Sequence, residues 1–272
     1  MSTFELKNID CLEYIKTMPD NSVDCIITDP PYYSTDLAFD KASRIDFDLW
    51  FKECFRVLKD SGNLISFSDF KLAREISLRK EFRYEIIWHK TRSMGFFDAN
   101  LRPLRNHEYI LVFGKEGFKK ESTYNPQKTQ GEPYGNKGNQ TNKHYGELKE
   151  HIRIINKDGL RYPTSVQTFS NANYNSAHPT AKPIKACEWL VSTYSDENNI
   201  VFDPFMGSGT TGIACMNLKR NFIGTELDTE YFEIAKSRVE KAYYSKNVEI
   251  KNDIIDLSEY RPRGESQLRF FK

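Results

Sequence analysis

The chain has 272 residues, 39% of them hydrophobic, and carries 39 Lys and Arg residues against 38 Asp and Glu residues. The resulting net charge of +1 excludes a protein that binds its partners through overall positive charge, and the hydrophobic fraction is ample for one large domain. No apolar run reaches the roughly 18 residues of a membrane-spanning helix, and the N-terminus lacks the pattern of a signal peptide. We therefore expect a soluble, cytoplasmic protein with no membrane partner.

The first 115 residues alternate short β-branched segments with helical patterns, which predicts an α/β fold with a largely parallel sheet. The predicted strands are Phe4–Ile9, Val23–Thr28, Asn63–Ser68, Tyr84–Lys90 and Tyr109–Gly114. Between the second and third strands, apolar residues from Trp50 to Leu58 lie at helical spacing on one face. Gly62 is the expected end of that helix.

The middle of the chain, residues 117–177, has little helical or strand periodicity and is rich in Asn, Gln, Lys, Gly and Pro. It holds nine Lys and Arg residues against five acids, a net charge of +4 that leaves −3 on the rest of the chain. Composition alone favours a solvated loop, but the six aromatic residues interleaved from Tyr124 to Tyr174 are too many for a linker. We therefore expect an ordered insertion that binds a ligand.

The α/β pattern resumes after this insertion. A helix is predicted from Pro183 to Tyr194, then strands at Asn199–Phe205 and Asn221–Glu226, and then a helix whose apolar face runs from Tyr231 to Ala242. The last residues, from Pro262 on, are expected to form a frayed tail.

The cysteines are odd in number and contain no Cys-x-x-Cys pair: Cys11, Cys25, Cys54, Cys187 and Cys215. This pattern indicates reduced thiols that mostly fill the core, with neither a disulfide framework nor a metal site.

A first functional loop follows the strand Val23–Thr28 and reads Asp29, Pro30, Pro31, Tyr32. Proline stiffens the turn and removes backbone donors, so a carboxylate, a main-chain carbonyl and an aromatic ring are left at a strand end. A site with acceptors only, beside a flat ring, suits the exocyclic amino group of a nucleobase. The alternative is a tight turn in which the aspartate carboxylate makes its hydrogen bonds within the turn itself.

A second loop, residues 203–212, reads Asp-Pro-Phe-Met-Gly-Ser-Gly-Thr-Thr-Gly and satisfies the pattern G-x-G-x-x-G. This pattern raises the alternative of an NAD-dependent oxidoreductase. Asp203, however, brings negative charge to the loop, which disfavours a pyrophosphate and suits a ligand with a cationic end. Glu226, at the end of the next strand, can accept both ribose hydroxyls. The combination indicates S-adenosylmethionine.

Three motifs together resemble the amino-group DNA methyltransferases, which methylate adenine N6 or cytosine N4. They are Thr-Asp-Pro-Pro-Tyr at 28–32, His-Pro-Thr-Ala-Lys-Pro at 178–183 and Asp-Pro-Phe-Met-Gly-Ser-Gly-Thr-Thr at 203–211. Their order resembles the circularly permuted β-class, in which the insertion is the target-recognition region. The resemblance implies the Rossmann-like fold of S-adenosylmethionine-dependent methyltransferases, with a seven-stranded, mostly parallel sheet flanked by helices.

The same resemblance divides the chain into a catalytic half (1–116), a target-recognition insertion (117–177), a cofactor-binding half (178–261) and a C-terminal tail (262–272). It implies that Asp29 and the Pro30 carbonyl accept the hydrogens of the target amino group, and that Tyr32 stacks on the flipped base. Pro31 completes the catalytic motif. The cofactor-binding residues it implies are Asp10, Cys11, Asp29, Thr180, Lys182, Asp203, Pro204, Phe205, Gly207, Ser208, Gly209, Thr210, Glu226 and Leu227. Asp10 is equally a candidate helix N-cap.

The chemistry needs no covalent intermediate, because two acceptors on the amine direct its lone pair at the sulfonium methyl. The resemblance implies adenine N6 as the target, because Asp29 opens the catalytic motif, with cytosine N4 as the alternative. The partners implied are duplex DNA, a homodimer and a cognate restriction endonuclease of a restriction-modification system. Arg153 and Arg161 are candidates for reading guanine or phosphate. The residues from Trp88 to Ser93 either face DNA or are solvated at a strand end.

Overall fold

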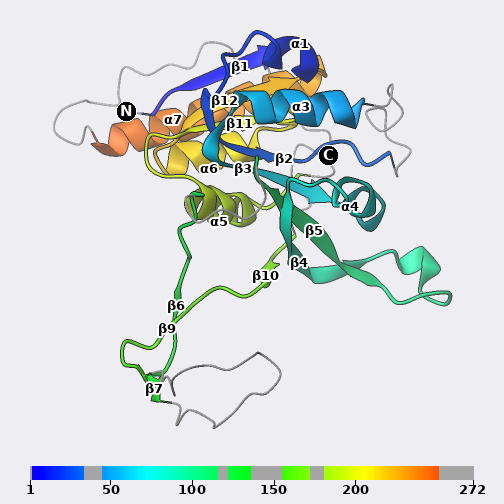
Figure 1. The fold of residues 1–272 in the computed structure, drawn as a ribbon, viewed down its shortest axis with the longest axis vertical. Coiled ribbons are helices and arrows are strands. Elements are labelled where there is room, and N and C mark those ends of the chain that lie inside the picture. The colour runs from blue at the N-terminus through cyan, green and yellow to red at the C-terminus, as the bar shows by residue number, and fades with distance from the viewer. Residues whose placement is uncertain (1, 34–44, 116–121, 136–154, 172–180, 251–272) are drawn as a thin grey trace, which may run out of the picture.

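The computed structural model describes residues 2–33, 45–115, 122–135, 155–171 and 181–250, which form one sheet with helices on both faces and a projecting arm (Figure 1). The sheet has eight strands in the order β1-β12-β11-β2-β3-β5-β4-β10. Their bounds are Phe4–Asn8 (β1), Val23–Thr28 (β2), Leu58–Ser68 (β3), Phe82–Met94 (β4), Arg105–Phe113 (β5), Val166–Phe169 (β10), Ile200–Asp203 (β11) and Asn221–Glu226 (β12). β5 runs antiparallel to both neighbours, and all other pairs are parallel.

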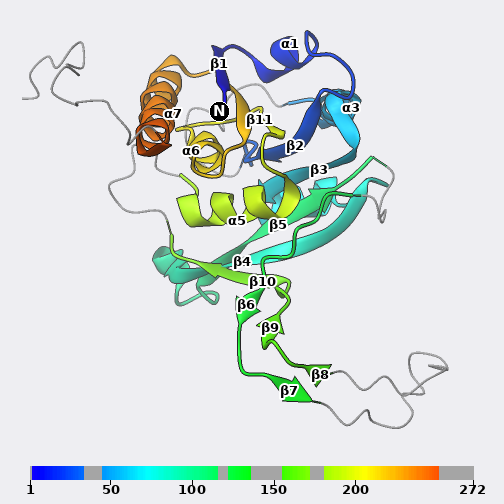
Figure 2. The same ribbon diagram turned by 90° about the vertical axis from the view of Figure 1, so that its left-hand side faces the viewer.

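Helices cover the two faces of this sheet (Figure 2). One face carries α1 (Cys11–Ile15), α3 (Phe47–Val57) and α4 (Phe70–Ile76), and the other carries α5 (Ile184–Tyr194), α6 (Thr210–Asn217) and α7 (Thr229–Ile250). Strand geometry explains the division, because neighbouring side chains point to opposite faces. Ile26 packs into the core under α1 and α3, whereas Ile27 packs into the core under α5 and α6. The predicted α/β class with a largely parallel sheet is confirmed.

The sheet has one strand more than the seven predicted, because β10 comes from the region expected to be an insertion. Its Val166 to Phe169 pair with Ile87 to Lys90 of β4. The remainder of the described insertion forms the arm, in which β6 (Thr129–Gln130) pairs with β9 (Leu160–Arg161) and β7 (Tyr134–Gly135) pairs with β8 (Ile155–Asn156). At its base, the Asn125 amide donates to the carbonyl of Thr193 at 2.7 Å.

The predicted end of the second helix, α3, at Gly62 is wrong. The helix ends at Val57, Leu58 is already extended, and Gly62 lies inside β3. A Cβ atom at Gly62 would come within 2.8 Å of the Asp24 carbonyl oxygen, so the absent side chain permits close approach of two strands.

All five cysteines are free and buried, as predicted from their spacing. Among the described helices, none is long and apolar enough to cross a membrane. The predicted tail, residues 262–272, lies outside the described residues.

Candidate active site

Parallel strands bring the two functional loops together at one edge of the sheet. β2 and β11 are neighbours in the sheet. After β2 the chain continues to β3 on one side, and after β11 it continues to β12 on the opposite side. Such a reversal opens a crevice between the loops that follow the two strands, and α/β proteins bind ligands there. The loop 29–32 therefore lies beside the loop 204–209, as the strand assignments predict.

Asp29 has a partner on each carboxylate oxygen. The Tyr32 hydroxyl donates to Oδ1, and the Lys182 ammonium donates to Oδ2 at 2.5 Å. Burial raises the pKa of Asp29 above its ordinary value, while Lys182 and Tyr32 oppose that rise. Lys182 Nζ also lies 5.4 Å from the centre of the Tyr32 ring. Of the three groups, Lys182 was expected to bind the cofactor and Tyr32 to stack on a base; both roles stay predictions.

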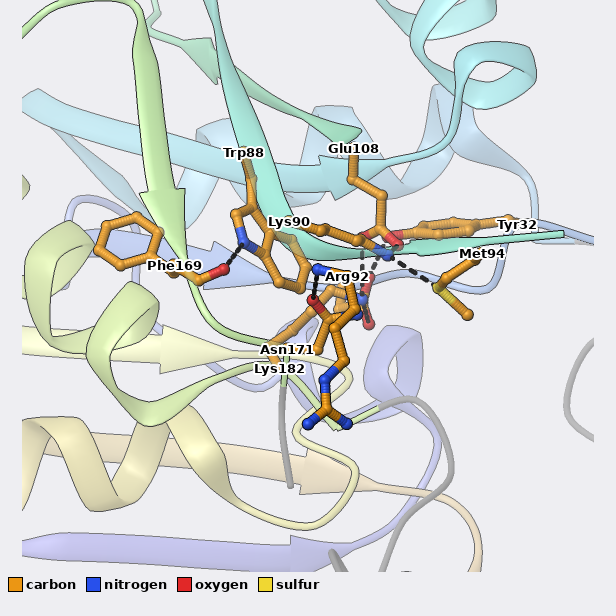
Figure 3. Close-up of polar contacts among 10 residues, drawn as sticks. Tyr32, Trp88, Lys90, Arg92, Met94, Glu108, Phe169, Asn171 and Lys182 are labelled. Atoms are coloured by element: carbon orange, nitrogen blue, oxygen red, sulfur yellow. Dashed lines mark hydrogen bonds and ion pairs between the residues drawn. The ribbon is translucent and has the colours of Figure 1, made fainter. Parts of the chain in front are cut away.

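Glu108 on β5 extends this arrangement into a buried chain of charges (Figure 3). Its Oε1 accepts a hydrogen bond from Lys90 Nζ, and its Oε2 lies 3.7 Å from Lys182 Nζ. The side chains of Lys90, Glu108 and Lys182 are only 7%, 16% and 9% exposed. Burial would raise the pKa of Glu108, but the two lysines outweigh it and hold that pKa below its ordinary value. Burial would lower the pKa of Lys182, but Asp29 and Glu108 outweigh it and raise that pKa.

The second loop is held to β12 by hydrogen bonds. The Gly207 amide donates to Glu226 Oε2 at 2.9 Å, and the Thr225 hydroxyl donates to the Pro204 carbonyl at 2.8 Å. Glu226 Oε1 accepts the amide of Asp228 at 2.9 Å. The predicted contact of Glu226 with the ribose hydroxyls of a cofactor stays a prediction.

The start of α6 is packed tightly against α7. Gly209 precedes the helix with φ +77°, and a Cβ atom there would lie 3.1 Å from Ala235. Ser208 and Thr210 are buried, and the guanidinium of Arg238 on α7 donates to the Ser208 carbonyl. A larger side chain at Gly209 therefore has no room beside α7.

Asp203, at the end of β11, is 3% exposed and accepts the Phe205 amide at 3.1 Å. Burial raises the pKa of Asp203 to about 7, although hydrogen bonds from Thr211 and the Phe205 backbone oppose the rise. The Phe205 ring lies 5.9 Å from that of Trp50. A carboxylate that is this costly to ionise is a good partner for a cationic ligand.

Asp10 follows β1, the strand that pairs with β12. Asp10 is the N-cap of α1, with its Oδ1 accepting the Leu12 and Glu13 amides at 2.8 and 3.2 Å. Cys11 is buried and Leu227 is exposed. The N-cap interpretation of Asp10 is confirmed, and a cofactor contact stays a prediction for all three predicted residues.

Thr180 lies outside the described residues, as do His178, Pro179 and Arg153. Pro30 is buried and Pro31 is half-buried at the end of β2. Arg161 is described, and its guanidinium packs over the Tyr134 ring at 4.4 Å.

Sequence reasoning missed Glu108. The solvated alternative is wrong for Lys90 and Trp88, because Lys90 is buried and paired with Glu108, and Trp88 is buried with its indole N–H donating to the Phe169 carbonyl at 3.1 Å. No signal in the sequence distinguished Glu108, which follows the polar residues Arg105, Asn106 and His107 and directly precedes the predicted strand Tyr109–Gly114. In the part of the chain that is described, no cluster of three or more His, Cys, Asp or Glu side chains is arranged to hold a metal ion.

Fold and site together define a doubly wound α/β protein of the Rossmann-like methyltransferase type, with a glycine loop and a carboxylate loop facing one crevice. A family model described as DNA methylase, for N6 and N4 methyltransferases, matches residues 23–237. The chain belongs to this family. That membership answers the alternative of an NAD-dependent oxidoreductase.

Individual relatives agree with the family. The chain is 31% identical over 252 residues to the Type II methyltransferase M.HpaI of Haemophilus parainfluenzae, covering 86% of this chain and 73% of that protein. It is similar to the crystal structure of an M1.HpyAVI–SAM complex, with a TM-score of 0.60, 27% identity and coverage of 87% of this chain and 100% of that one. The fold is also that of the PvuII cytosine-N4-specific DNA methyltransferase, with a TM-score of 0.61, 17% identity and coverage of 90% and 92%.

Proposed function

We propose that this protein is a site-specific DNA methyltransferase that transfers the methyl group of S-adenosylmethionine to N6 of an adenine flipped out of duplex DNA. The observation that carries the proposal is the position of the Asp29 carboxylate, at the end of β2 and next to the glycine loop after β11. An acceptor for an amino group thus lies beside a loop suited to an adenosine cofactor.

The residues around the crevice fit S-adenosylmethionine. A carboxylate has about four acceptor sites, so Glu226 can accept ribose hydroxyls beside its backbone amides, and the ionised form of buried Asp203 would suit the cationic end. Gly207 and Gly209 both have positive φ, a conformation in which residues with side chains are strained, so the loop has a backbone path that glycine permits. When bound, this cofactor supplies an electrophilic methyl group on a sulfonium.

The catalytic loop would activate the amine. The Asp29 carboxylate and the Pro30 carbonyl accept one hydrogen bond each from the amino group. These bonds hold the nitrogen out of conjugation with the ring, so that its lone pair points at the methyl group. Methyl transfer leaves one proton too many on that nitrogen. Asp29, whose pKa is raised by burial, is suited to receive it. The cost of flipping, a few kcal/mol, is offset by stacking on Tyr32 and by contacts to the DNA backbone.

A hairpin at the same edge of the sheet offers a surface for DNA. The hairpin formed by β4 and β5 extends past Lys90. The loop that joins the two strands contains η1 (Phe96–Asp98), at the far end of the hairpin in Figure 1. Phe97 and Leu101 are highly exposed there, and so are Arg92 and Arg105. Cationic side chains around an apolar tip suit phosphates and partly unstacked bases.

The wider setting follows the resemblance. We propose that the enzyme forms a homodimer and works beside a cognate restriction endonuclease, for which light scattering and co-expression are the direct measurements. The name Type II methyltransferase, carried by the relative M.HpaI, supports this setting.

The decisive experiment is methyl transfer from tritiated S-adenosylmethionine to mixed-sequence duplex DNA, followed by hydrolysis and separation of the nucleosides. Label is expected in N6-methyladenosine, with an Asp29→Ala variant inactive. Glu233→Gln, which changes an exposed acid on α7, is the matched control and should stay active. Label in N4-methylcytosine would instead establish the cytosine alternative, for which the same two acceptors serve.

A further inference from the structure

The catalytic carboxylate is already occupied in this structure. Tyr32 donates to Oδ1 of Asp29, and the Lys182 ammonium donates to Oδ2 at 2.5 Å. An arriving amino group is a neutral, weaker donor than an ammonium, so it competes poorly for an oxygen that holds a buried lysine. Efficient capture of the target amine therefore requires another acceptor for Lys182.

Glu108 has the position and the free atom for this role. Its Oε1 is taken by Lys90, but Oε2 is buried and has no hydrogen-bond partner among the described residues. Lys182 Nζ lies 3.7 Å from that oxygen, within about 1 Å of hydrogen-bond distance (Figure 3). A buried carboxylate oxygen without a hydrogen bond is costly, which suggests that it is kept for a partner that comes and goes.

We propose that Lys182 holds Asp29 by a hydrogen bond before the target base binds, and that its ammonium moves to Oε2 of Glu108 when the target amino group arrives. Glu108 is then a positioning residue. The inference rests on the proposed role of Asp29. No proton or covalent bond is transferred in this step, which exchanges one hydrogen bond for another.

Charge balance makes the movement inexpensive. Asp29, Glu108, Lys90 and Lys182 comprise two anions and two cations, so the buried set is neutral whichever carboxylate holds Lys182. Moving a lysine out to solvent would instead strand Asp29 and Glu108 with a single cation, which is the costly case for buried charges. The flexible stem of lysine permits the short shift between the two acceptors.

A stability cycle tests the sharing of Lys182 without DNA or cofactor. In Asp29→Asn the lysine keeps Glu108, in Glu108→Gln it keeps Asp29, and only the double variant deprives it of both. The urea midpoint of the double variant should therefore fall by more than the sum of the two single shifts. In a Lys182→Met background this excess should disappear. Additive shifts would overturn the inference, since Lys182 would then be committed to one carboxylate.

A kinetic test asks whether the sharing serves catalysis. On DNA that the wild type methylates, Glu108→Gln should raise the KM for DNA by about tenfold or more, because the lysine stays on Asp29. Its dissociation constant for S-adenosylmethionine should stay within about twofold of the wild type, and Glu85→Gln, an exposed acid on β4, should behave as the wild type. An unchanged KM refutes the role of Glu108. A wild type that transfers no methyl group refutes the proposed function instead, and the urea midpoints then still test whether Lys182 is shared between the two carboxylates.

Discussion

Asp203 gives the protein a pH-dependent stability that can be worked out from its burial. Burial raises its pKa from 3.8 to about 7, so the folded protein binds a proton that the unfolded chain releases above pH 4. The contribution of Asp203 to the free energy of unfolding is therefore largest below about pH 4, falls as the pH rises toward 7, and stays reduced above that value. The rise in pKa corresponds to about 4 kcal/mol over the whole range, and to roughly 3 kcal/mol between pH 5 and pH 8.

Replacing Asp203 with Asn removes this titration, while the amide oxygen can still accept the Phe205 amide. Urea unfolding at pH 5 and pH 8 measures the effect, with Glu233→Gln as the control that should follow the wild type. Relative to Asp203→Asn, the wild type should lose roughly 3 kcal/mol between these pH values. Parallel stability curves for the two proteins would show that Asp203 is not buried as a carboxylic acid, and the reasoning would fail.

Two further changes probe the cofactor loop and the hairpin. Gly209→Ala introduces a Cβ atom at φ +77° and 3.1 Å from Ala235, so we expect a loss of about 1–2 kcal/mol in thermal unfolding and weaker stabilisation by S-adenosylmethionine; an unchanged melting temperature would contradict the packing described. Arg105→Ala on the exposed hairpin should weaken DNA binding across sequences and lower the salt slope by about 1 in a fluorescence-anisotropy titration, whereas an unchanged slope would place DNA elsewhere.

The position of the two functional loops could be predicted from the sequence, because each motif directly follows a strand with a strong β-branched pattern. Parallel strands then bring Asp29 and Asp203 to the same edge whatever their separation along the chain. Glu108 could not be found in this way. It reaches the site only because β5 is antiparallel, and its first half therefore lies at the edge where the other strands end.

The partner of Lys182 was beyond sequence reasoning for a different reason. The sequence motif of Lys182 predicts where its backbone lies. Its side chain has four rotatable bonds, so the ammonium can reach either the crevice or the nearby carboxylates. The early end of α3 was missed because Gly62 is a plausible helix terminator by type, and only the neighbouring strand reveals that it serves close packing with Asp24.

The strand β10 has a consequence for exchanging the predicted target-recognition region between relatives. Because Val166 to Phe169 complete the sheet beside β4, a chimera joined at residues 117 and 177 would remove a strand together with the arm and leave the edge of β4 bare. Junctions near Lys128 and Tyr162 would instead exchange the arm alone. These two residues already touch, with Lys128 Nζ 4.4 Å from the Tyr162 ring, so the two ends of a transplanted segment would start side by side.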